Sequence, residues 1–206
     1  MKKVSFFRSI HIKFVLIYVL LILVAMQVIG VYFTDRLEAR LESNFKESVR
    51  EKISLLAFNV EEEMSKERGE NDNSLEEDIR SLLYDFSSSD ISEIQIINDR
   101  SKIIGTSDRE NQGIVGKRAT DLLIKRTLVV GLDDENVYLD ENTNERIWVL
   151  ATPIKKNDKV IGAIYLVATI ENVYEQLREI INIFATGTII ALGVTAVLGV
   201  LLAQTI

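Results

Sequence analysis

The sequence predicts an α+β fold, in which a domain with a five-stranded antiparallel sheet and a long N-terminal helix lies between two membrane-spanning helices. Two uncharged apolar runs, residues 14–33 and 180–203, stand near the ends of the 206-residue chain. All 31 acidic residues and 20 of the 24 basic ones lie between them, so residues 34–179 carry a net charge of −11. In that segment helical patterns come first, and short β-branched runs divided by turns follow.

The first apolar run, residues 14–33, is long enough to cross a membrane. At about 1.5 Å per residue, its 20 residues match a hydrocarbon core of roughly 30 Å. A cleaved secretory signal is the alternative, but the run exceeds the usual apolar region of about 7–15 residues and no clear cleavage site follows. Residues 1–13 are basic and hold no acid, so the positive-inside tendency places this tail in the cytoplasm and residues 34–179 outside the cell.

The second apolar run, residues 180–203, is expected to return the chain to the cytoplasm, with residues 204–206 inside. Its length allows a span with some tilt. Gln27 in the first span predicts an interhelical hydrogen bond, unless its amide reaches the outer interface instead. In the second span, small residues at four-residue intervals predict a packing seam, although small residues are common in membrane helices. The seam residues are Gly187, Ala191, Thr195 and Gly199.

Apolar residues at steps of four and three from Leu37 to Met64 predict a long helix that continues the first span. No Gly or Pro interrupts residues 34–68. The stripe has two interpretations, packing on the domain's own sheet and a seam shared with a second subunit. Steps of mainly four residues favour the first, because a long coiled coil alternates threes and fours. Ser74 and Glu77, in capping-box spacing, predict a second helix from residue 75 to about residue 86.

Short β-branched runs later in the chain predict the five strands. The segments EIQIIND and SKIIGTSD predict the first hairpin, and turn-rich links short enough for hairpins join the last three strands. The last strand runs into residues 171–184 without a helix breaker, so a helix is expected to join the sheet to the second span. The expected elements are a hairpin that turns at Asp99 and Arg100, a short helix over residues 119–126, and strands over residues 136–140, 145–154 and 159–170.

The composition excludes most catalytic and metal-binding chemistry for this chain. It has no cysteine, which removes disulfides, thiolate metal sites and thiol nucleophiles. Its one histidine, His11, lies beside the first span, so neither a histidine triad nor a multi-histidine metal centre can form. No catalytic residue, metal ion, cofactor or nucleic-acid partner is expected for these 206 residues.

The most plausible place for a ligand is between the sheet and the segment GKRATDLLIKR. The cations Lys117, Arg118 and Arg126 in that segment suit an anionic fragment, such as a wall peptide or a glycan carboxylate. The alternative is that these are ordinary surface cations and that the nearby aromatic residues belong to the core. The aromatic residues expected to form the apolar walls are Tyr138, Trp148 and Tyr165.

The sequence also carries a family resemblance. The opening segment FFRSIHIKFVLIYVLLILVAMQVIGVYF, followed by GKRATDLLIKR and VIGAIYLVATIENVYEQL, resembles the N-terminal part of the WalK (YycG) family, the essential sensor histidine kinases of low-GC Gram-positive bacteria. The resemblance covers the whole chain. It implies that the outer region is a PAS or Cache-like domain, with Ser101 at a turn where glycine is frequent. It also implies that LAQTI begins a HAMP linker that continues after residue 206.

The resemblance implies a sensing and relay function at the cell membrane. The full protein would be a homodimer that autophosphorylates with ATP and Mg and passes the phosphoryl group to a response regulator of cell-wall metabolism. Two accessory membrane proteins, YycH and YycI, would contact the spans and the outer domain. The alternatives are a chemoreceptor or cyclase-type transducer and a non-signalling wall or division scaffold. Sequence beyond Ile206 would distinguish them.

Overall fold

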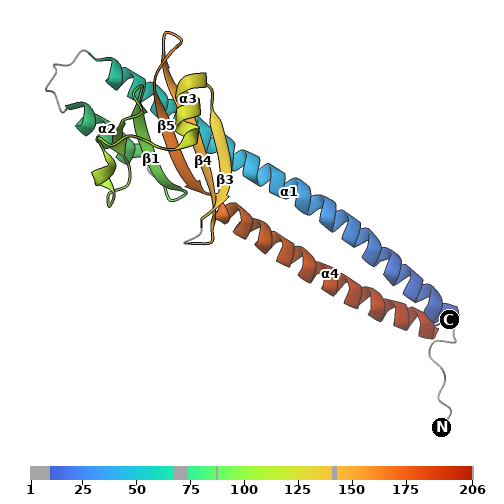
Figure 1. The fold of residues 1–206 in the computed structure, drawn as a ribbon. Helices are drawn as coiled ribbons and strands as arrows, with labels where there is room; N and C mark the ends of the chain where they lie inside the picture. Colours follow the sequence, from blue (N-terminus) through green and yellow to red (C-terminus); the bar gives the residue numbers. More distant parts are fainter. Residues whose placement is uncertain (1–9, 67–73, 87, 141–142, 206) are drawn as a thin grey trace. The chain divides into compact units, whose positions relative to one another are not determined.

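The structure, a computed structural model, describes residues 10–66, 74–86, 88–140 and 143–205 (Figure 1). Most of the predicted cytoplasmic tail, and Ile206 of the predicted linker, lie outside these residues. The chain divides into two compact units. One unit, residues 42–172, contains the sheet and is called the outer unit here; the other combines residues 1–41 with residues 173–206 and contains the two apolar segments.

The first helix, α1 (Ile10–Ser65), is one continuous helix. This was predicted, because neither Gly nor Pro interrupts its sequence after residue 33. Within the outer unit its apolar stripe packs on its own domain. Packing on the domain's own core is therefore confirmed for this part of the stripe. The buried members are Val49, Ile53, Leu56 and Val60.

The predicted five-stranded antiparallel sheet is confirmed. Its strand order is β2-β1-β5-β4-β3, and every pair of neighbours is antiparallel. The last strand is thus inserted between the first hairpin and the β3–β4 pair, so the centre of the sheet is made from residues far apart in sequence. The strands are β1 (Ile91–Asn98), β2 (Ile103–Thr106), β3 (Asp134–Leu139), β4 (Arg146–Lys156) and β5 (Lys159–Thr169).

Two tight turns fix the register of this sheet. In the β1–β2 turn, Ser101 adopts a φ of 61°, a left-handed conformation in which glycine is the usual residue. The side chain of Asn98 stabilises this turn, because its Oδ1 accepts the backbone N–H groups of Arg100 at 3.0 Å and Lys102 at 2.9 Å. The two residues between β4 and β5 also have positive φ, as a two-residue hairpin loop with the twist of its strands requires.

The short helix α3 (Leu122–Val130) corrects the predicted helix over residues 119–126. Asp121 is the N-cap, since its side chain accepts the N–H of Leu123, and Gly131 ends the helix at a φ of 71°. Ala119 precedes the helix, and its N–H donates to the carbonyl of Ser101 at 2.7 Å. The prediction placed the helix too early because it did not use these two caps.

α1 and α3 cover opposite faces of the sheet (Figure 1). On β4, Trp148 contacts Phe45 of α1, whereas the next residue, Val149, packs in a cluster with Leu123 of α3. The helix α2 (Ser74–Phe86) packs on β2, where an added Cβ at Gly105 would lie 2.5 Å from the side chain of Ile79. A short 3-10 turn, η2 (Gln112–Ile114), lies in the segment between β2 and α3 and was not predicted.

The last helix, α4 (Glu171–Thr205), begins one residue after the end of β5 and continues through the second apolar run. The predicted helical connection between the sheet and the second apolar run is therefore confirmed. Among the described residues, α1 and α4 each contain a stretch that is long and apolar enough to cross a membrane, with mean hydropathies of 2.5 and 2.0.

Candidate functional site

The outer unit contains a pocket of about 290 Å³ between the sheet and the segment that leads from η2 into α3. Ile103 of β2, Ile114 of η2 and Ile124 of α3 give it an apolar part. Polar groups form the rest of the lining, so the pocket suits a small molecule that has both apolar and polar groups. The polar lining includes Gln95, Asn111, Lys117, Arg118, Asp121 and Tyr165.

Three of the six predicted ligand residues, Lys117, Arg118 and Tyr165, line this pocket. The ammonium of Lys117 and the guanidinium of Arg118 are exposed and have no acidic partner among the described residues. Two uncompensated cations beside an apolar surface can attract an anion that carries an apolar group. Their role in binding stays a prediction.

Asp121 connects the pocket to two elements of the fold. One carboxylate oxygen, Oδ1, accepts the N–H of Leu123 at 2.8 Å and so caps α3. The other oxygen, Oδ2, accepts the hydroxyl of Tyr165 on β5 at 3.1 Å. Burial, followed by the negative charge of Asp121, raises the pKa of Tyr165 above its ordinary value. Asp121 was not among the predicted site residues, although an Asp directly before an apolar helical run is an N-cap signal.

The alkaline pH dependence of stability should reveal this contact. Because the pKa of Tyr165 is higher in the folded state, its stabilising effect is complete below the ordinary tyrosine pKa of about 10 and is lost as the pH rises above that value. Tyr165→Phe should be less stable by about 1 kcal/mol at pH 7, and this difference should shrink between pH 10 and pH 11. Urea unfolding across this pH range measures it, and a constant difference would contradict the contact.

The other three predicted ligand residues do not line the pocket. Arg126 is paired with Asp134, with Nε 2.6 Å from Oδ2. Tyr138 lies on the edge strand β3 and is 45% exposed. Trp148 is fully buried and contacts α1, on the sheet face opposite the one that α3 covers.

Trp148 instead joins α1 to the β3–β4 edge of the sheet. Its indole Nε1–H donates to Oε2 of Glu135 at 2.7 Å, and the guanidinium of Arg50 lies 2.6 Å from the same oxygen. Arg50 also lies 5.4 Å from the centre of the indole ring, and Phe45 meets that ring edge-on at 6.3 Å. Sequence reasoning missed Arg50 and Glu135, because 85 residues separate them and no local pattern connects them.

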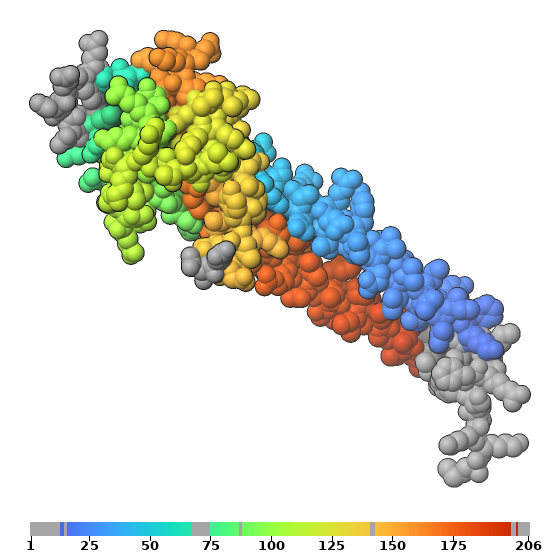
Figure 2. All heavy atoms as spheres, viewed as in Figure 1, coloured from blue at the N-terminus to red at the C-terminus, as the bar shows by residue number. Residues whose placement is uncertain are grey.

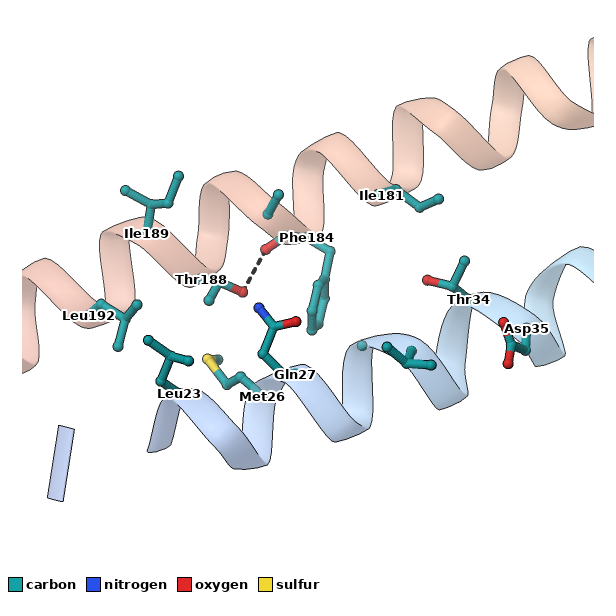
Figure 3. A pocket seen from close by; sticks show the side chains of 13 residues that line it. Leu23, Met26, Gln27, Thr34, Asp35, Ile181, Phe184, Thr188, Ile189 and Leu192 are labelled. Carbon is teal, nitrogen blue, oxygen red and sulfur yellow. Dashed lines mark hydrogen bonds between the residues drawn. The ribbon is translucent and has the colours of Figure 1, made fainter. Parts of the chain in front are cut away.

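In the unit formed by residues 1–41 and 173–206, a groove of about 530 Å³ lies between α1 and α4 (Figure 3). Gln27 points across the groove toward Phe184 and Thr188. Phe184 packs on Gly30, where an added Cβ would lie 2.8 Å from its ring. The hydroxyl of Thr188 donates to the carbonyl of Phe184 at 2.9 Å, as hydroxyl groups of membrane helices often do. The interhelical hydrogen bond of Gln27 stays a prediction.

The small-residue stripe of α4 does not line this groove. An added Cβ at Gly187 would meet no atom within 4 Å, so this glycine is not needed for contact with the same chain. Ala191 and Thr195 are partly buried, and the hydroxyl of Thr195 donates to the carbonyl of Ala191 at 2.8 Å. Gly199 lies in α4, but its surroundings are outside the described residues. A role of the stripe in packing stays a prediction.

Comparison with known proteins finds sequence similarity to one family of sensor kinases. The model of the WalK sensor protein kinase Cache domain matches residues 78–168. The whole chain is 39% identical to the sensor histidine kinase WalK of Bacillus subtilis (strain 168) and 35% identical to the sensor protein kinase WalK of Staphylococcus aureus (strain JH9). The chain spans about a third, 34%, of the length of each of these curated relatives.

Solved structures similar to the chain include further sensor domains. The sensor domain of the Vibrio cholerae histidine kinase DctB aligns with a TM-score of 0.48 and 9% identity, over 68% of this chain and 55% of that one. The ligand-binding domain of the Pseudomonas aeruginosa chemoreceptor PctC aligns with a TM-score of 0.47 and 15% identity, over 72% and 61%. The argument rests on the match of the family model and on the identity along the whole chain. The chain is therefore similar over its whole length to the N-terminal sensor region of the WalK sensor histidine kinases, and residues 78–168 match the Cache domain of that family.

Proposed function

We propose that this chain is the sensing and relay portion of a two-pass membrane histidine kinase that controls cell-wall metabolism. The observation that carries the proposal is that each apolar segment continues as a helix into the outer unit: α1 contacts the sheet at Trp148, and α4 begins one residue after β5 ends. A sensor transmits a signal only if binding favours one arrangement of such helices over another. The similarity of the chain to WalK along its whole length supports the kinase assignment.

In the full protein, a cytoplasmic kinase region after residue 206 would use ATP and Mg to phosphorylate itself as a homodimer and then transfer the phosphoryl group to a response regulator. Residues 1–206 would supply no catalytic group. The accessory proteins YycH and YycI would contact the membrane helices and the outer unit. Deleting the region that follows residue 206 should abolish phosphoryl transfer and leave membrane insertion intact.

The proposed topology places the N-terminus inside the cell, residues 14–33 and 180–203 in the membrane, and residues 34–179 outside. Single cysteines test it directly, because the chain has none of its own. Cysteines that replace the exposed residues Ser54 and Ser92 should react with an impermeant maleimide on intact cells. A cysteine at Lys3 should react only after lysis. Protection of the first two positions on intact cells would refute the proposal.

The proposed ligand of the outer pocket is a small carboxylate, such as a wall-peptide fragment, held by Lys117 and Arg118 with Tyr165 as one wall. The dipeptide D-alanyl-D-alanine is a suitable probe for the full chain in nanodiscs. At ten times its dissociation constant, a bound ligand should stabilise the protein by about 1.4 kcal/mol, seen as a higher melting temperature.

Matched controls separate this binding from general charge effects. Lys117→Gln with Arg118→Gln should remove the stabilisation, whereas Lys52→Gln with Arg80→Gln, which changes two exposed cations elsewhere, should preserve it. The dipeptide amide, which lacks the carboxylate, should have no effect. Equal stabilisation by the acid and the amide would show that the cations do not recognise a carboxylate. The topology test does not depend on this result.

A further inference from the structure

One end of α3 carries aliphatic side chains that are exposed and are not packed in the core of the outer unit. Val129 is 86% exposed, Val130 is 63% exposed and Leu132, just after the helix, is 64% exposed. On the same helix, Leu123 and Ile124 are buried against the sheet. Single exposed aliphatic residues are ordinary, but three within four positions concentrate exposed apolar area at this end of the helix.

The β4–β5 hairpin places exposed lysines beside this surface. Lys155, Lys156 and Lys159 flank its two-residue loop, and Lys156 is paired with Lys159 across the strands. Like charges directly opposite each other destabilise a sheet. None of the three ammonium groups makes an ion pair or a hydrogen bond within the part of the chain that the structure describes. Their charges are therefore available to a partner.

Direct contact makes the helix end and the hairpin one surface. An added Cβ at Gly131 would lie 3.2 Å from Cγ2 of Val160 and 3.6 Å from Cε of Lys155, so the loop after α3 rests on the hairpin. Figure 2 shows the end of α3 in yellow next to the orange hairpin on one face of the outer unit. This surface is called the distal patch. It comprises Val129, Val130, Leu132, Lys155, Lys156 and Lys159.

The distal patch lies at the end of β5 that is opposite the start of α4. β5 (Lys159–Thr169) has 11 residues, which at about 3.3 Å per residue separate its ends by roughly 33 Å. α4, which leads into the second apolar run, begins after the far end of this strand. The distal patch and the connection to the second apolar run are therefore at opposite ends of β5.

Charge and polarity specify the partner. Residues 34–179 carry a net charge of −11, yet four lysines gather here, the three of the distal patch and Lys125 on the same helix. The acids nearest to them in sequence are Asp133, Asp158 and Asp134, and Asp134 is already paired with Arg126. An acidic partner is repelled by most of the domain and attracted here. The aliphatic side chains need an apolar complement, which a sugar or phosphate polymer does not offer but a protein segment does.

We propose that the distal patch is a docking surface for an acidic protein segment that also carries aliphatic or aromatic residues. The aliphatic side chains would form the buried centre of the contact, and the lysines its charged rim. This surface is distinct from the ligand pocket, because none of its residues lines that pocket.

Photo-crosslinking in cells tests the docking surface on the full-length protein. A photoreactive amino acid at Val129 should give a protein adduct, and mass spectrometry should place the crosslink in a segment that is rich in Asp or Glu. The same amino acid at Leu122 is the matched control, because this residue is 65% exposed on the same helix but lies outside the distal patch. The yield at Leu122 should be at least tenfold lower.

Charge reversal completes the test. Lys155→Glu, Lys156→Glu and Lys159→Glu together should lower the yield at Val129 at least fivefold, whereas Arg100→Glu with Lys102→Glu, near the other hairpin turn, should not change it. Each protein is first shown to have an unchanged melting temperature. An adduct to lipid or to a wall polymer, or no adduct at Val129, would overturn the proposal. A crosslink yield at Val129 that the charge reversal does not lower would also overturn it.

Discussion

Replacing Trp148 by alanine should lower the free energy of unfolding by about 3–5 kcal/mol, the range for large aromatic residues in cores. Trp148 is fully buried, and its loss would leave a cavity between α1 and β4. It would also remove the indole N–H that donates to Glu135, and the ring over which Arg50 lies. Urea unfolding of the full chain, followed by circular dichroism, measures the effect.

Two variants separate the sources of this loss. Trp148→Phe keeps an aromatic ring but removes the indole N–H, so it should cost less than Trp148→Ala. Tyr138→Ala, one strand away but 45% exposed, should change stability by less than about 1 kcal/mol. If Trp148→Ala cost no more than Tyr138→Ala, the joint between α1 and the β3–β4 edge would not stabilise the outer unit.

The elements of this fold were predictable because their signals are local. The apolar period of α1, the capping-box spacing at the start of α2 and the alternating strands all lie within short windows of sequence, and the structure has the expected helix or strand at each. The turn at Ser101 was also expected, and its positive φ shows how serine occupies a position that glycine usually holds. α3 was misplaced because its caps, Asp121 and Gly131, decide its bounds, and the prediction relied on its apolar residues alone.

The site was less predictable, because its members meet only after the sheet forms. Tyr165 and Asp121 are 44 residues apart, and the insertion of β5 between β1 and β4 brings them together. Residue type alone suggested Trp148 as a pocket wall. Its position in β4 places Trp148 on the sheet face that α1 covers, while Tyr165 in β5 lies on the opposite face, which α3 covers. A shift of one residue along a strand changes the face, so the predicted aromatic walls could not be assigned without the register.

Inserting four glycines after Glu179 should uncouple the outer unit from kinase output, provided that the proposed sensor function holds. Glu179 is exposed and lies within α4, between the sheet and the second apolar run. Glycine costs about 1 kcal/mol per residue in a helix relative to alanine, so four in succession make a flexible joint. A signalling coupling of about 1–3 kcal/mol corresponds to a 5- to 150-fold change in output, and the insertion should reduce this change to none. Phosphorylation of the response regulator, measured with and without the stimulus, gives the ratio.

A helical insertion at the same place is the matched control. Seven residues of an alanine-rich helix make close to two turns at 3.6 residues per turn, so they preserve both the rigidity of α4 and the direction of its faces. This variant should retain most of the stimulus response, although its chain is longer than that of the glycine variant. Five helical residues should instead rotate the segment by about 140° and change the basal output. Full regulation in the glycine variant would mean that α4 does not transmit the signal, and that the signal reaches the cytoplasm through α1 alone.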